Sequence, residues 1–300
     1  MTSFNVDIQT PDGAMDCFIA HPDGNGPFAP VILYMDVPGI REELRDMARR
    51  LADDGFVGVL PDLYYREGKV RFDLTKGESE LKKMFAVGSK LSNAMIMRDT
   101  QGILDYLAGQ SFASAKVGTV GYCMSGQFVI SAAGTFPDQI KATASLYGTR
   151  IVTDQEDSPH QLIPAMQGEA YLGFAAHDPY VEDHVIPELQ ARLAENTDLV
   201  SELEVHAETE HGFCFPLRPQ YKADAAERVW DKMIQMYRRT LGEGQKYEDR
   251  CSGLMFRPGD RPRQFGQACP SDGSRRIGFA AFRRTCPLVQ RDGVWLPRLP

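Results

Sequence analysis

The chain has 300 residues, of which 43% are hydrophobic, and a formal net charge of −8 at pH 7. This apolar fraction is enough for a buried core, and the acidic balance argues against binding to nucleic acid or to an anionic membrane surface. The sequence does not begin with a basic stretch followed by an apolar run, and it has no run of about eighteen apolar residues. A cytoplasmic protein is therefore expected.

Six cysteines occur, at positions 17, 123, 214, 251, 269 and 286, and none forms a Cys-x-x-Cys pair. The spacing indicates neither a zinc ribbon nor a thioredoxin-type redox motif. In a reducing compartment most of these residues are expected to be free thiols. No phosphate-binding loop or dinucleotide fingerprint opens a helix, so no cofactor is expected.

Up to residue 245, short β-branched segments alternate with longer amphipathic ones, which is typical of a parallel sheet with crossover helices. Two alternating segments, 4–10 and 14–20, flank a Pro-Asp-Gly turn and predict an antiparallel hairpin at the sheet edge. Strands are then predicted at 31–36, 56–60, 116–122, 141–147, 170–177 and 202–208, and helices at 41–55, 92–108, 124–136, 185–195 and 223–241. The predicted fold class is α/β, with helices on both faces of a doubly wound, mostly parallel sheet.

Residues 246–300 differ in composition from the rest. They contain eleven Lys and Arg against five Asp and Glu, or +6, so residues 1–245 carry −8 − 6 = −14. Twelve Pro and Gly and the lack of a sustained period predict a disordered tail after one domain of residues 1–245. An arginine-rich arm for nucleic acid and an out-of-frame extension are two other interpretations.

The segment TVGYCMSGQF, residues 119–128, joins a predicted strand to a predicted helix. A nucleophile on such a turn needs small residues two positions before and after it. With Ser125 as nucleophile one of these positions is Gln127, which is too large, whereas with Cys123 they are Gly121 and Ser125. Cys123 is therefore favoured, at a helix N-terminus whose N–H groups suit a thiolate and an oxyanion. A buried structural cysteine, with Ser125 as the helix N-cap, is the alternative.

An acid and a base follow in the chain order expected after such a nucleophile. Asp178 comes directly after the predicted strand 170–177, and His211 follows the predicted strand 202–208. Open α/β sheets place their sites at the carboxyl ends of strands, so these side chains can meet Cys123. Rivals for the two roles lie close by: His177, Asp183, His184 and His206.

The other histidines are predicted to have structural roles. His206 is expected inside a strand and His184 on a helix surface, while His21 and His160 stand beside prolines in loops, with nothing to pair with. No His-x-x-x-His or matching carboxylate spacing near Asp178 supports a metal site.

Four motifs occur in collinear order between about residues 4 and 241: PDLYYR (61–66), VGTVGYCMSG (117–126), HDPYV (177–181) and HGFCFP (211–216). Together they resemble the dienelactone hydrolase (carboxymethylenebutenolidase) family. The resemblance implies an α/β-hydrolase fold and hydrolysis of an ester or lactone through a thioester intermediate. It also implies a catalytic triad of Cys123, Asp178 and His211.

Further site residues are implied by the same resemblance. The oxyanion hole would be formed by the backbone N–H groups of Met124 and Val37. The family's glutamate, which interacts with the cysteine thiol and helps to deprotonate it, falls on Asp36, which is one methylene shorter; the alternative for this aspartate is a cap of the following helix. The arginines that hold a substrate carboxylate in well-known members are not assigned, although Arg71 and Arg218 lie in plausible regions.

A thiolate is itself a good leaving group, so the expected substrate is a small ester or lactone whose oxygen departs readily, and an amide is not expected. Two alternatives stay open: a catalytically weak pseudo-hydrolase that binds a small molecule or senses thiols, and a serine hydrolase that uses Ser125. No membrane or nucleic-acid partner is expected, and the protein is expected to be a monomer or a small homo-oligomer.

Overall fold

The computed structural model describes residues 1–73, 76–242, 288–291 and 294–297. The chain divides into two units, Met1–Asp249 and Arg250–Pro300. In the second unit the structure describes two antiparallel strands, β9 (Leu288–Arg291) and β10 (Val294–Pro297). Apart from these strands, the predicted disordered tail lies outside the described residues and stays a prediction.

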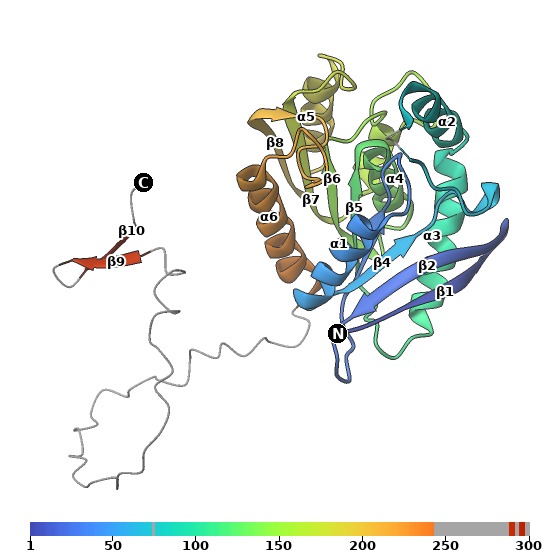
Figure 1. The fold of residues 1–300 in the computed structure, drawn as a ribbon, viewed down its shortest axis with the longest axis horizontal. Helices are drawn as coiled ribbons and strands as arrows, with labels where there is room; N and C mark the ends of the chain where they lie inside the picture. Colours follow the sequence, from blue (N-terminus) through green and yellow to red (C-terminus); the bar gives the residue numbers. More distant parts are fainter. Residues whose placement is uncertain (74–75, 243–287, 292–293, 298–300) are drawn as a thin grey trace, which may run out of the picture. The chain divides into compact units, whose positions relative to one another are not determined.

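The first unit is built on an eight-stranded sheet with the order β1-β2-β4-β3-β5-β6-β7-β8 (Figure 1). The strands are β1 (Thr2–Thr10), β2 (Gly13–His21), β3 (Pro30–Tyr34), β4 (Val57–Pro61), β5 (Val117–Tyr122), β6 (Ile140–Leu146), β7 (Gly168–His177) and β8 (Leu199–Glu210). Strand β2 pairs antiparallel with β1 and β4, and all the other pairs are parallel. The mostly parallel sheet and its edge hairpin are thus confirmed.

Six α-helices and three short 3₁₀ helices are described in this unit: α1 (Glu42–Asp53), η1 (Tyr65–Glu67), α2 (Glu78–Gly88), α3 (Asn93–Ala108), η3 (Cys123–Ser125), α4 (Gly126–Thr135), η4 (Pro159–Ala165), α5 (Val185–Glu195) and α6 (Ala223–Leu241). The helix predicted at 124–136 starts as the 3₁₀ turn η3. Helix α2 is missing from the sequence prediction because two of its apolar side chains, Leu81 and Phe85, are 38% and 49% exposed and blur its periodicity. No helix of the described residues is both long and apolar enough to span a bilayer.

Helices cover both faces of the sheet. Gly58 of β4 and Gly118 of β5 are both in register with Val31 of β3, so all three lie on one face. A Cβ atom at Gly58 would lie 2.4 Å from the backbone oxygen of Ala48 in α1, and one at Gly118 would lie 3.1 Å from the ring of Tyr237 in α6. Helices α1 and α6 therefore pack closely on this face, while α3 and α4 lie on the other (Figure 1).

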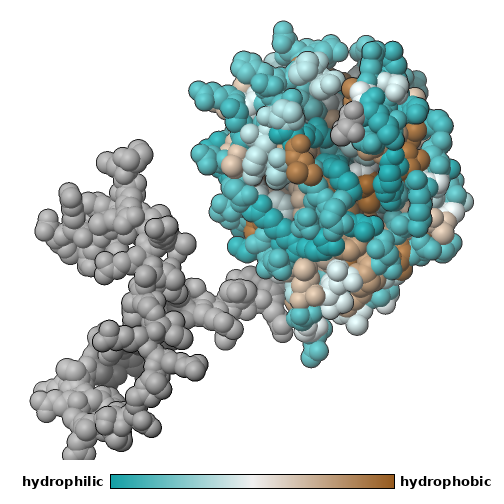
Figure 2. Space-filling model, in the orientation of Figure 1, coloured by the Kyte–Doolittle hydropathy of each residue, from teal (hydrophilic) through white to brown (hydrophobic). Residues whose placement is uncertain are grey.

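The core lies along the central strands, since β3, β4 and β5 are buried over their whole length. The face drawn in Figure 2 is largely hydrophilic, with only small separate hydrophobic patches. Because β3, β5, β7 and β8 are parallel, their carboxyl ends lie at one edge. Asp36 and Val37 follow β3, Cys123 follows β5, Asp178 follows β7 and His211 follows β8, so this edge is where a site can form.

Candidate active site

Cys123 stands on a strained turn between β5 and α4. Its φ angle is +56°, a left-handed conformation that costs a residue with a side chain about 1 kcal/mol or more. The backbone N–H of Thr149 donates to the Cys123 carbonyl at 3.0 Å, and the cysteine side chain keeps intermediate exposure. A strand, a strained residue and a helix in this order have the backbone geometry that nucleophile elbows use to present a side chain at the sheet edge.

The close packing of this turn explains its small residues. A Cβ atom at Gly121 would lie 2.4 Å from the carbonyl oxygen of Ser125 and 2.9 Å from the Val129 side chain. The Ser125 hydroxyl is fully buried and donates to the Met35 carbonyl, and it makes no capping hydrogen bond to α4. Ser125 thus stands at the N-cap position of α4 without capping it through its side chain, and its buried, bonded hydroxyl does not favour an attacking serine.

A substitution of Gly121 by alanine is expected to lower the free energy of unfolding by about 1–3 kcal/mol, because the added methyl group overlaps the Ser125 backbone. If Cys123 is the nucleophile of the expected ester hydrolysis, kcat should also fall, since a shift of the elbow by about 1 Å costs on the order of 100-fold in rate. Urea unfolding and ester turnover measure the two effects. Gly109→Ala is the matched control, because its Cβ atom would meet only Tyr106 at an ordinary 3.5 Å. Equal effects of the two substitutions would contradict the steric argument.

His211 and Asp178 form a hydrogen-bonded pair. Nδ1 of His211 lies 2.8 Å from Oδ2 of Asp178, and the two side chains are 8% and 3% exposed. The backbone N–H of Tyr180 donates to the other carboxylate oxygen of Asp178 at 3.0 Å. The rings of Tyr147 and Tyr180 lie edge-on to His211, with centroids 5.0 and 4.7 Å away. The imidazole is thus fixed in orientation by one carboxylate and two aromatic rings.

The surroundings of His211 favour its protonated form. Burial lowers the pKa of His211, but Asp178 and Cys123 outweigh this and raise it to about 9. Nε2 of His211 is buried and makes no hydrogen bond of normal geometry to the described residues, although Cys123 lies close enough to perturb the pKa of the ring. Nε2 is therefore the nitrogen left for exchanging a proton with the cysteine or a substrate.

The two residues expected to form the oxyanion hole lie together. The Tyr64 hydroxyl donates to the Val37 carbonyl at 2.7 Å and lies 4.0 Å from the sulfur of Met124. A Cβ atom at Gly88, the last residue of α2, would lie 2.9 Å from the Val37 side chain and 3.4 Å from the Met124 sulfur. Among the described residues, no acceptor pairs with the Val37 N–H, which leaves it available for a substrate oxygen.

Asp36 is fully buried and held by two arginines. Its carboxylate accepts hydrogen bonds from both terminal nitrogens of Arg41, one of them at 3.3 Å, and from Arg218. Both guanidinium groups lie over the ring of Phe215, at 4.7 and 4.9 Å. Asp36 does not cap α1, whose N-cap is Arg41, and within the described part of the chain it makes no hydrogen bond to Cys123.

Of the two arginines left unassigned from the sequence, Arg218 reaches Asp36, whereas Arg71 pairs with Asp62 at 2.9 Å. Arg41 and Tyr64 were not anticipated as neighbours of the site. Tyr64 lies inside the motif PDLYYR, so that motif was a signal for it, but no local pattern marked Arg41.

Two histidine predictions are confirmed. His206 is buried, with Nε2 3.0 Å from the Tyr171 hydroxyl, and burial lowers its pKa. The side chain of His184 is 55% exposed at the start of α5. Within the described ranges, no three His, Cys, Asp or Glu side chains are grouped to hold a metal ion.

Two other histidine predictions are wrong. His160 is buried and does have partners: its Nδ1 lies 2.8 Å from the Ser158 hydroxyl and its Nε2 3.2 Å from Glu188. His21 stacks on the ring of Phe112 at 4.7 Å. Glu188 and Phe112 come from distant segments, so the sequence around each histidine gave no sign of them.

Comparison with known proteins shows which family the sequence resembles. Residues 15–241 match the sequence model of the Dienelactone hydrolase family. The chain is 27% identical over 241 residues to a "Putative carboxymethylenebutenolidase" of Methylorubrum extorquens, covering 78% of this chain and 79% of that protein. It is 28% identical over 261 residues to a protein of the same name from Escherichia coli K12, covering 79% and 92%.

Among solved structures, a "Putative Dienelactone Hydrolase" from Klebsiella pneumoniae superimposes with a TM-score of 0.69 at 22% identity, covering 79% of this chain and 98% of that one. This likeness confirms the expected type of fold.

Proposed function

The chain belongs to the dienelactone hydrolase family, and from this premise we propose that it hydrolyses an ester or a lactone with Cys123 as the nucleophile. One observation supports this most: the 2.8 Å hydrogen bond between His211 and Asp178 beside a cysteine on a strained elbow. A nucleophile, a base next to it and a carboxylate that orients the base make up the arrangement of covalent acyl transfer.

The proposed reaction has two halves. His211, oriented by Asp178, takes the Cys123 proton, and the thiolate attacks the substrate carbonyl. The N–H groups of Met124 and Val37 hold the oxyanion, and His211 gives its proton to the departing alkoxide, which leaves a thioester. In the second half His211 takes a proton from water, the hydroxide attacks the thioester, and the proton returns to the sulfur as the acid is released.

The leaving group should limit the substrate range. The tetrahedral intermediate can expel either the thiolate or the oxygen, so turnover requires an oxygen that departs readily. We expect activated aryl esters and lactones that open to an enolate to be hydrolysed, and the corresponding amides not to be. A screen of such pairs tests this, with Cys123→Ala as the blank. Cleavage of amides at rates close to those of their esters would contradict the thiolate mechanism.

Asp36 is proposed to help deprotonate the Cys123 thiol when substrate displaces one of the two arginines that hold the Asp36 carboxylate. Because Asp36 is buried between Arg41 and Arg218, Asp36→Asn leaves Arg218 without its carboxylate and Arg41 with Glu43 alone. We expect this substitution to lower the free energy of unfolding by about 3 kcal/mol, and kcat by about tenfold or more. The matched control is Glu67→Gln, since Glu67 pairs with Lys90 at the surface, where loss of the pair costs less than about 1 kcal/mol. Unchanged kcat in folded Asp36→Asn protein would remove Asp36 from the mechanism.

A cytoplasmic location, a small-molecule substrate without nucleic-acid or membrane partners, and a monomeric or small homo-oligomeric state accompany this proposal as predictions.

A further inference from the structure

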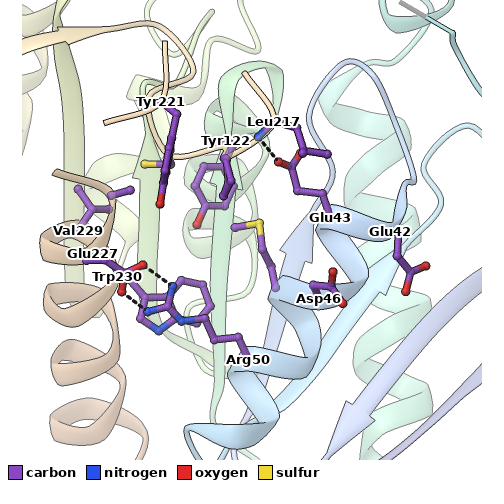
Figure 3. A pocket seen from close by; sticks show the side chains of 14 residues that line it. Glu42, Glu43, Asp46, Arg50, Tyr122, Leu217, Tyr221, Glu227, Val229 and Trp230 are labelled. Atoms are coloured by element: carbon purple, nitrogen blue, oxygen red, sulfur yellow. Dashed lines mark hydrogen bonds and ion pairs between the residues drawn. The ribbon is translucent and has the colours of Figure 1, made fainter. Parts of the chain in front are cut away.

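A cavity of about 390 Å³ lies between α1, α6 and the segment 214–221 (Figure 3). Cys123, His211 and Asp178 do not line it. Two of its lining residues are nevertheless close to them in the sequence: Tyr122 directly precedes Cys123, and Cys214 lies three residues after His211. The volume is within the range of pockets that bind small molecules, about 300–1,000 Å³.

Most of the cavity wall is apolar or aromatic. Tyr122, Tyr221 and Trp230 contribute rings, and Met47 and Val229 contribute aliphatic surface. At the edge stands Leu217, which is 81% exposed and whose backbone N–H is bonded to Glu43 of α1 at 3.1 Å. A leucine so exposed at the edge of an apolar cavity offers surface that a bound molecule would cover.

The charged groups of the wall are already paired. Each carboxylate has a guanidinium partner: Glu43 with Arg41, Glu227 with Arg50, and Glu42 and Asp46 with Arg49. Arg50 also lies over the Trp230 ring at 4.2 Å. A charged ligand would have to lose its water without gaining a free counter-charge, so an uncharged ligand fits this wall better.

Two hydroxyl groups of the wall, those of Tyr122 and Tyr221, make no hydrogen bond to the described residues, and the one on Tyr122 belongs to the more buried ring. Tyr122 is only 2% exposed, and its hydroxyl, which points into the cavity in Figure 3, makes no hydrogen bond to the described residues. Burial raises the pKa of Tyr122, so the hydroxyl stays protonated and can donate. The hydroxyl oxygen stays accessible from the cavity, so a ligand oxygen can take the place of water as its hydrogen-bond partner.

We propose that this cavity is a second binding site, for a small uncharged aromatic molecule whose oxygen accepts a hydrogen bond from Tyr122. The rings of the wall pack on the aromatic body, and the paired charges leave no place for an ion. The site is separate from the place where the proposed hydrolysis occurs, so its occupation does not depend on that function.

The probe for this proposal is 4-nitrobenzyl alcohol, an uncharged aromatic alcohol that quenches tryptophan emission on contact. The chain has two tryptophans, at 230 and 295, and Trp230 lies in the cavity wall. In the Trp295→Phe protein we expect saturable quenching of Trp230. Ala226→Phe, which fills the cavity, and Tyr122→Phe, which removes one oxygen atom, should each weaken binding by about tenfold or more.

Ala223→Phe is the matched control, because Ala223 is exposed on the same helix and does not line the cavity, so it should leave the affinity unchanged. Circular dichroism checks that the variants fold; if Ala226→Phe does not, Tyr122→Phe alone decides. The proposal is overturned if quenching does not saturate, or if the affinity survives the substitutions at 226 and 122. The proposal is also overturned if the probe competes with an ester substrate but does not change Trp230 emission. The probe would then bind at the catalytic residues.

Discussion

Replacing Cys123 with alanine is expected to lower kcat/KM for an activated aryl ester by about 1,000-fold or more. The substitution removes the atom that forms the proposed thioester, and no other described side chain on this elbow can replace it. The small change in volume at a residue of intermediate exposure should leave the free energy of unfolding nearly unchanged. Steady-state kinetics with an aryl acetate, together with urea unfolding, measures both quantities.

Ser125→Ala is the control for this experiment, since it removes a hydroxyl two residues away. That hydroxyl is buried against the Met35 carbonyl, so we expect a loss of about 1 kcal/mol in stability and retention of most of the activity. The opposite result, an active Cys123→Ala and an inactive Ser125→Ala, would transfer the nucleophile to the serine. Full activity in both variants would refute hydrolysis at this elbow altogether.

The parts of this protein that were predictable from the sequence depend on neighbours in the chain. The strands follow from β-branched runs, and the preference for Cys123 follows from the size of Gly121 and Gln127, which the 2.4 Å approach to the Ser125 oxygen explains. Asp178 follows β7 directly and His211 follows β8 directly, so the ends of the two strands locate them.

The parts that were not predictable depend on contacts between distant segments. Arg218 reaches Asp36 across 182 positions of the chain, and His160 meets a glutamate of α5. Nothing in the residues around Asp36 shows that two guanidinium groups will hold it. Helix α2 was missed for a related reason, since its exposed Leu81 and Phe85 interrupt the pattern that marks a buried face.

Asp178→Asn should be the most informative substitution among the residues that do not form the proposed covalent bond. The amide keeps the size of the side chain but removes the charge that favours protonated His211, and it can stabilise the wrong tautomer of the ring. We expect kcat to fall by about 1,000-fold or more, with little change in KM. A variant that retained most of the wild-type kcat would remove Asp178 from the proposed catalytic residues.

The raised pKa of His211 also predicts how the free energy of unfolding depends on pH. The pKa of His211 is about 9 in the folded protein and about 6.5 in an unfolded chain, so the folded state holds the extra proton more tightly. The stabilisation is therefore fully present below about pH 6.5 and is lost as the pH rises through about 9.

Since Asp178 raises the pKa of His211, its loss should destabilise the protein most near pH 6 and least near pH 10. Urea unfolding of both proteins at these two pH values gives the difference directly. A stability difference that stays constant from pH 6 to pH 10 would mean that the carboxylate does not stabilise the imidazolium, and the pair could then not serve as the proposed base.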